Sequence, residues 1–185
     1  MNPDQIDGYV VNGLDADLDR WAAGWPRVAV PATTRPVEPF LARLPPAAAT
    51  ALAAFDSRVR SGTMPQFGDT YDWSYGFDFA ANDCEILDSD YETALSDEDV
   101  WSIGADGGGN LHVVLTNGRV AVWFHEEQVI EEHTQFASLD VFVWSVLRLE
   151  AVRAGVLDRV GVAADFQALE KAGALQTSVG VLHYL

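Results

Sequence analysis

This sequence of 185 residues lacks the features that mark membrane, secreted and disulfide-rich proteins. No segment reaches the roughly 18 uninterrupted apolar residues that a membrane-spanning helix requires, so we expect no membrane partner. The first residues, MNPDQIDGYVV, carry acids where a signal peptide needs a basic region, so we expect no export signal. Cys84 is the only cysteine and cannot form an internal disulfide, which fits a cytoplasmic location.

Lysine and arginine are also scarce. The chain has 11 Lys and Arg against 28 Asp and Glu, a formal net charge of −17. No Lys or Arg lies between Arg60 and Arg119, whereas 12 acids lie from Asp69 to Asp106. This balance argues against nucleic acid as a partner, because phosphate binding needs cationic contacts. The acidic region has two interpretations: a solvated loop region that keeps the protein soluble, or a patch that steers and docks a basic partner.

A glycine-rich hairpin between Asp99 and His125 is the clearest structural signal that is present. Asn117-Gly118 joins two apolar segments, a pattern that predicts a two-residue type I′ turn. That turn pairs Leu115 with Val120, Val113 with Val122 and Leu111 with Phe124. These six side chains would form one face, which we expect to pack on a helix at 139–154. The glycines at 107–109 predict a tight connection between strands, needing positive φ.

The remaining elements follow from spacing and caps. We predict a short helix ending near Gly24, an extended connector with prolines at 26, 31, 36 and 39, a helix from Pro45-Pro46 to Gly62, a strand at 70–80, an acidic loop at 82–99, a strand at 100–103, a loop or short edge strand at 126–132, a helix at 139–154 capped by Ser138, a helix at 164–172 and an apolar tail at 179–185. This order predicts one α+β domain: a mainly antiparallel sheet with a central Gly-rich turn and an Asn-Gly hairpin, and helices packed on one face.

Candidate cofactor and metal motifs are incomplete. The run Gly104–Asn110 lacks the dinucleotide fingerprint and is followed by a strand where a phosphate-binding loop needs a helix. Asp88, Asp90, Glu92 and Asp99 have the spacing of a calcium loop, but Thr93 stands where the turn needs glycine.

The histidines form only a weak candidate for a zinc site, and no serine is a candidate for a catalytic nucleophile. His112 and His125 would be diagonal neighbours on the hairpin, with Glu126, Glu127 and His133 nearby, although packing against Trp123 is the commoner role for such histidines. No serine lies in a nucleophile-elbow context. We therefore expect no metal, no cofactor and no enzymatic activity.

The hairpin region resembles the core of the SUKH superfamily, which includes a yeast cell-wall assembly regulator family and many bacterial immunity proteins. Its members show a strand ending in glycine and an Asp-Gly-Gly-Gly-like turn, here Trp101-Ser-Ile-Gly104-Ala-Asp-Gly-Gly-Gly-Asn110. A later strand carries Val-x-x-Trp-x-His, here Val120-Ala-Val-Trp123-Phe-His125. The start of the following helix, Phe136-Ala-Ser138-Leu-Asp-Val-Phe142, is similar to the Ser-Phe-x-x-Phe-Leu element of the family.

The resemblance implies an α+β fold without catalytic residues. Residues 41–155 would form the SUKH-like core, with 1–40 as an N-terminal extension and 156–185 as a C-terminal helix and tail. It also implies a protein partner, because bacterial members bind and neutralise cognate toxins, often nucleases. The oligomeric state stays open.

An acidic surface suits such a partner, since it can mimic the phosphate backbone that a basic nuclease surface binds. The resemblance supplies no fixed binding residues, so we select the contact from the charge pattern: Asp83, Glu85, Asp88, Asp90, Glu92, Asp97, Glu98 and Asp99. Two other functions stay open: a regulatory or scaffolding module with a constitutive cellular partner, and a small-molecule or metal-binding enzyme-like domain.

Val122→Asp tests the expected place of the hairpin in the core. A charge at this position has no partner in an apolar interior, so we expect the variant to unfold. Thermal unfolding followed by circular dichroism measures the effect. An unchanged melting temperature would show that this hairpin position is not part of the core.

Overall fold

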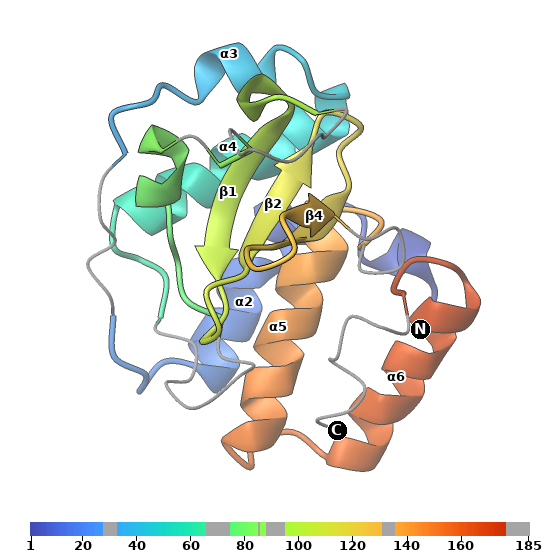
Figure 1. Ribbon diagram of the computed structural model, residues 1–185. Coiled ribbons are helices and arrows are strands. Elements are labelled where there is room, and N and C mark those ends of the chain that lie inside the picture. The colour runs from blue at the N-terminus through green and yellow to red at the C-terminus, as the bar shows by residue number, and fades with distance from the viewer. Residues whose placement is uncertain (28–32, 66–74, 85, 88–94, 131–135, 177–185) are drawn as a thin grey trace.

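The structure is a computed structural model that describes residues 1–27, 33–65, 75–84, 86–87, 95–130 and 136–176 (Figure 1). Its α-helices are α1 (Tyr9–Asn12), α2 (Leu14–Trp21), α3 (Glu38–Leu41), α4 (Pro46–Arg60), α5 (Leu139–Arg153) and α6 (Arg159–Lys171). Short 3-10 helices are η1 (Pro3–Gln5), η2 (Ala80–Asp83) and η3 (Asp97–Asp99). No helix among these residues combines the length and the apolar character needed to cross a membrane.

Four antiparallel strands form the sheet, in the order β1 (Val100–Ala105), β2 (Leu111–Leu115), β3 (Val120–Phe124) and β4 (Val129–Ile130). The helices α2, α4 and α5 lie on one side of this sheet (Figure 1). Side chains of that sheet face belong to the main core, whereas the opposite face packs a smaller apolar cluster that includes Ile86 and Leu87. These two residues belong to the loop predicted at 82–99, which we call the acidic segment. The predicted α+β architecture is confirmed, and the helices cover one sheet face.

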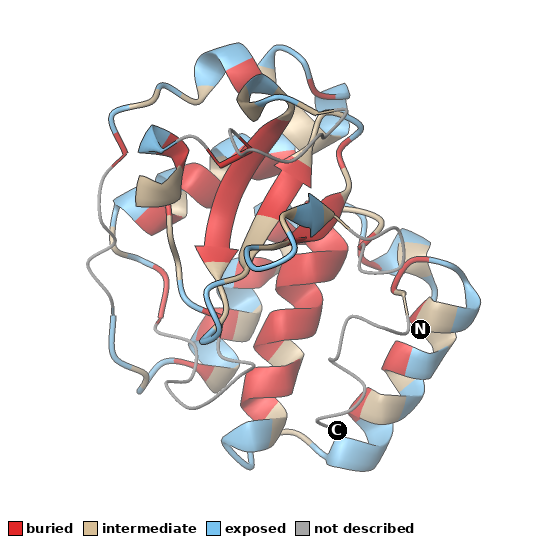
Figure 2. Cartoon of the chain, viewed as in Figure 1, coloured by how far each residue is buried: buried red, intermediate tan, exposed pale blue. Residues whose placement is uncertain are grey.

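The α5 helix is buried on nearly every side (Figure 2). Ser138 caps it by accepting a hydrogen bond from the Val141 N–H, as predicted, at 3.2 Å. Its apolar residues extend beyond the predicted stripe because α1, α4 and α6 surround it and His112 of β2 contacts Phe142 from the sheet. A helix that is apolar all round is expected in such a central position.

Two polar side chains of α5 hold the N-terminal helices. The Asp140 carboxylate accepts hydrogen bonds from the Gly8 and Val10 N–H groups at 3.1 and 2.7 Å, and burial raises its pKa. Arg148 forms an ion pair with Asp17 at 3.1 Å and stacks over the Trp144 ring at 4.0 Å. Residues near the N-terminus therefore form part of the main core, whereas the resemblance implied an N-terminal extension at 1–40.

The predicted register of the Asn-Gly hairpin is wrong by one residue. Val114, not Leu115, lies opposite Val120, and His112 lies opposite Val122. The loop has three residues: the Gly118 N–H donates to the Leu115 carbonyl at 2.8 Å, and Gly118 alone adopts positive φ, at 84°. This geometry is a turn followed by a bulge, the usual form of a three-residue hairpin loop.

The register shift moves the β2 side chains to the other face. Val120 of β3 lies in the main core as expected, but Val113 of β2 belongs to the smaller cluster under the acidic segment. His112 and Val114 lie opposite Val122 and Val120, and so take the positions on the helix-facing side that the predicted pairing gave to Val113 and Leu115.

The other predicted elements differ mainly at their ends. The helix at 164–172 begins earlier, at Arg159, because Asp158 caps it by accepting from the Gly161 N–H at 2.8 Å. The predicted strand at 70–80 is described only from residue 75, where Gly76 forms one isolated bridge to Ala105 and a 3-10 helix follows. The tail at 179–185 lies outside the described residues.

Gly104 lets the main core close against β1. A Cβ atom on this residue would lie 2.1 Å from Cε2 of Tyr75 and 2.5 Å from the Gly76 carbonyl oxygen. The Tyr75 side chain is buried here, and its hydroxyl donates a hydrogen bond to the Ile103 carbonyl. The strand also bulges between Ser102 and Gly104, so any side chain at this position must displace backbone.

Gly104→Ala tests this close approach. We expect a loss of about 1–3 kcal/mol of unfolding free energy, because overpacking forces the ring and the strand apart. Gly24→Ala is the matched control, since a Cβ there meets nothing within 4 Å, and we expect it to change stability by about 0.5 kcal/mol or less. Chemical denaturation measures both, and equal stability of the two variants would contradict the role of Gly104.

Candidate functional site

Four of the eight acids selected from the sequence lie among the described residues: Asp83, Asp97, Glu98 and Asp99. The other four, Glu85, Asp88, Asp90 and Glu92, lie outside the described residues. The structure brings the four described acids against one stretch of the N-terminal half of the chain, residues 33–43, which we call the brace segment.

Asp83 binds the start of the brace segment. Its carboxylate accepts hydrogen bonds from the Thr33 hydroxyl at 2.7 Å, the Thr34 N–H at 2.8 Å and the Arg35 N–H at 2.9 Å. These donors, the Thr33 hydroxyl first, lower the pKa of Asp83 to about 2. The group is exposed, and nearly all of these bonds end on Oδ1, whereas Oδ2 accepts only from the Thr34 N–H, at 3.0 Å.

Asp97 is held from two sides. Its carboxylate accepts from the Leu87 N–H at 2.7 Å, and its backbone carbonyl accepts from Nη2 of Arg35 at 3.0 Å. The Arg35 guanidinium also lies over the Trp101 ring, 5.2 Å from its centroid. This contact places Arg35 between the acidic segment and the main core.

Arg43 holds the end of the acidic segment. Its Nη2 lies 2.6 Å from the Asp99 carboxylate, and its Nη1 donates to the Glu98 carbonyl. Asp99 also accepts from the Ser96 N–H and hydroxyl, each at 2.8 Å; these bonds, with Arg43, lower its pKa. The Glu98 carboxylate is different: it lies 3.8 Å from Arg43, and its side chain is 86% exposed.

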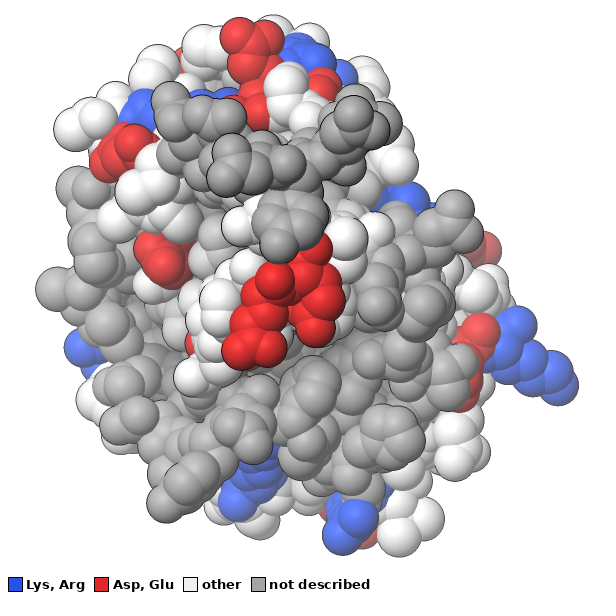
Figure 3. Space-filling view, in the orientation of Figure 1, with Lys and Arg blue, Asp and Glu red and all other residues white. Residues whose placement is uncertain are grey.

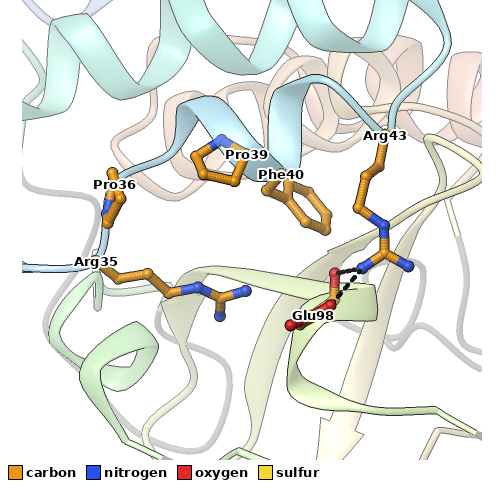
Figure 4. Close-up of a pocket in the computed structure, with 6 residues that line it drawn as sticks. All are labelled: Arg35, Pro36, Pro39, Phe40, Arg43 and Glu98. Carbon is orange, nitrogen blue, oxygen red and sulfur yellow. Dashed lines mark hydrogen bonds and ion pairs between the residues drawn. The ribbon is translucent and has the colours of Figure 1, made fainter.

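A pocket of about 290 Å³ opens between the brace segment and the acidic segment (Figure 4). It is lined by Arg35, Pro36, Pro39, Phe40, Arg43 and Glu98. Sequence reasoning missed the basic and apolar members of this set, since it assigned the proline-rich stretch to an extended connector. The signal that could have found them is the six arginines in the first 60 residues, which leave that part almost neutral beside a strongly acidic one.

Acidic side chains also gather near the centre of the face in Figure 3, and Lys and Arg lie towards its edge. Glu126 and Glu127, in the β3–β4 connection, are exposed. The described part of the chain therefore presents carboxylates beyond those selected from the sequence.

The glycine turn binds its own carboxylate. Asp106 accepts hydrogen bonds from the Gly108 and Asn110 N–H groups at 2.8 and 2.9 Å, and Gly109 alone in the turn adopts positive φ, at 93°. The amides that could cradle a phosphate point to this carboxylate. The turn joins β1 to β2, and of its three consecutive glycines only Gly109 has positive φ.

The two histidines of the hairpin have separate surroundings. His112 contacts the rings of Tyr75 and Phe142, at centroid distances of 5.6 and 5.0 Å. His125 instead lies beside Asn110, with Nδ1 3.1 Å from the amide oxygen. Among the described residues no group of three or more metal-ligating side chains is placed to hold an ion, while His133 of the zinc hypothesis and three of the calcium-loop acids lie outside them.

Comparison of the chain with protein-family models, with curated proteins and with solved structures gives no match in any of the three. The function is therefore inferred from the residues and their geometry, together with the resemblance of the hairpin region.

Because His112 is buried, we expect the folded protein to lose stability at acid pH. Burial lowers its pKa to about 4, and the charge of Asp106 opposes this shift only in part. The unfolded chain, with a histidine pKa of about 6.5, therefore binds the proton first. Stability from this group is complete above pH 6.5 and falls by about 3 kcal/mol as the pH decreases to 4.

Denaturant unfolding of the parent and of His112→Gln between pH 4 and 7 measures this loss. The variant removes the titrating ring, so its stability should fall less steeply over this range than that of the parent. Parallel pH profiles would contradict the assignment.

Proposed function

We propose that this chain is a non-catalytic protein-binding domain of the immunity type, which binds and neutralises a basic protein, such as a nuclease toxin domain, through the surface of its acidic segment. One observation carries the proposal: 12 acids and no Lys or Arg lie between residues 61 and 118. A surface of one sign attracts a partner of the opposite sign and accelerates its association. The resemblance to SUKH immunity proteins supports the class of partner.

The contacts of the brace segment support an ordered binding surface. Asp83, Asp97 and Asp99 are held by donors from the same chain, so their positions are fixed before a partner arrives. Preorganised charges lose less conformational entropy on binding than mobile ones. Among the four described acids of the acidic segment, Glu98, whose side chain is 86% exposed, is best placed to contact a partner directly.

Glu98→Lys tests the proposal against a matched control, Asp19→Lys. Both variants change the net charge equally, but Asp19 lies exposed on α2, in the helical layer. The tagged full chain is used to isolate its partner from the cell of origin at low salt. We expect a basic protein whose association with the chain slows about tenfold for Glu98→Lys and is little changed for Asp19→Lys.

Salt dependence provides the second measurement. At about 1 M salt the Debye length is about 3 Å, so steering by the acidic surface is screened and association should slow strongly. An association rate that ignores salt, or that falls equally in the two variants, would contradict binding through the acidic segment. A partner that is not basic would favour the regulatory or scaffolding alternative.

A further inference from the structure

The pocket between the brace segment and the acidic segment contains an arginine, Arg35, that pairs with no carboxylate of the described residues. In the described part of the chain, the Arg35 guanidinium donates one hydrogen bond, to the Asp97 carbonyl, and takes part in no ion pair. A guanidinium carries five N–H donors, so most of those on Arg35 remain available. Its contact with the Trp101 ring fixes the group in place at the pocket.

The second guanidinium of the pocket already binds carboxylates. Figure 4 shows Arg35 and Arg43 entering from opposite sides, with Glu98 between them at the lower edge. The Glu98 carboxylate lies 3.8 Å from Nη1 of Arg43, too far for a hydrogen bond, and its side chain is exposed enough to turn away. The chain therefore places a weakly held carboxylate of its own at the mouth of the pocket.

The rest of the lining is apolar. Pro36, Pro39 and Phe40 form the upper wall in Figure 4, and Phe40 stacks on the buried Trp101 at a centroid distance of 5.9 Å. The volume of about 290 Å³ is at the small end of the roughly 300–1,000 Å³ usual for ligand pockets. A ligand of about the size of one amino acid fits this space.

We propose that this pocket binds a small apolar group that ends in a carboxylate, with the carboxylate on Arg35 and the apolar part on Phe40 and the two prolines. A planar carboxylate matches the donor geometry of a guanidinium. Two arginines in the lining oppose a cationic ligand. The acids beside Arg43 oppose a multiply charged phosphate, so a single negative charge suits the pocket best. This ligand is additional to the basic partner proposed above.

The test is a titration of the full-length 15N-labelled chain with N-acetyl-L-phenylalanine, followed by NMR at the Trp101 indole N–H. The matched ligand is N-acetyl-L-phenylalaninamide, which keeps the ring and removes the charge. We expect saturable shifts with the acid, and an affinity at least about tenfold weaker for the amide, since charge-assisted hydrogen bonds are lost.

Three variants locate the binding. Arg35→Gln should lower the affinity for N-acetyl-L-phenylalanine at least about tenfold and leave the affinity for the amide unchanged. Arg159→Gln, which removes an exposed arginine at the start of α6, should bind the acid like the parent. Glu98→Gln should strengthen acid binding several-fold, because it removes the competing carboxylate. The affinity should thus fall in Arg35→Gln and rise in Glu98→Gln, a difference that a general loss of structure would not produce. Thermal melts of each variant check that the fold is kept.

Several results would overturn the proposal: no saturable shift at any soluble concentration, equal affinity for the acid and the amide, or unchanged acid affinity in Arg35→Gln. N-acetyl-Gly-Gly-Phe distinguishes the source of the group. Tighter binding of this peptide than of the single residue would identify the C-terminus of a polypeptide, and equal binding a free small molecule. If the pocket binds no such ligand, the proposed function is still tested separately, by the salt dependence of partner association and by Glu98→Lys.

Discussion

The burial of α5 on all sides is the constraint on which the rest of the structure depends. A helix with apolar residues around its whole circumference is stable only when other elements enclose it. The sheet, α4, α6 and the N-terminal helices provide this enclosure, and the two polar groups that face the N-terminal helices, Asp140 and Arg148, find partners there. Each of these carries a charge into a largely apolar region, so removing its partner would leave a costly unpaired group.

In the acidic segment, the main constraint is the repulsion between carboxylates that lie close together. Carboxylates at 83, 97, 98 and 99 repel one another when they are brought to one surface. The brace segment offsets this repulsion with backbone N–H groups, hydroxyls and the guanidiniums of Arg35 and Arg43. The near-neutral first 60 residues and the acidic middle of the sequence are thus two parts of one electrostatic arrangement.

Local signals were sufficient for the long helices α4 and α5 and for most of the sheet, but not for the one-turn helices α1 and α3. Pro46 at the start of α4 and Ser138 before α5 mark boundaries through backbone chemistry that needs no tertiary context. The register of the hairpin needed more, because Asn-Gly fits both two-residue and three-residue loops. In the structure Gly118 packs against α4, where a Cβ would lie 2.9 Å from that of Ala48, a contact that no hairpin pattern contains.

Only part of the candidate site could be predicted, because its contacts also depend on tertiary structure. Charge counting identified the acidic segment, since composition alone carries that signal. It could not pair Arg43 with Asp99 or Arg35 with Asp97, because these partners lie 56 and 62 residues apart and meet only in the folded chain. The all-round burial of α5 was likewise invisible, as it depends on helices from both ends of the sequence.

The outer edge of β3 limits how another protein can approach the sheet. At one end, Val120 exchanges backbone hydrogen bonds with Phe136, at 3.1 and 2.7 Å. At the other end, Trp123 and Phe124 pair with the two residues of β4. Among the described residues, β3 is therefore already paired at both ends, and the strand beyond it, β4, has two residues, too few for an extended ladder. Recognition of a partner at this edge falls to side chains, and backbone pairing of the kind that builds fibrils has little to extend.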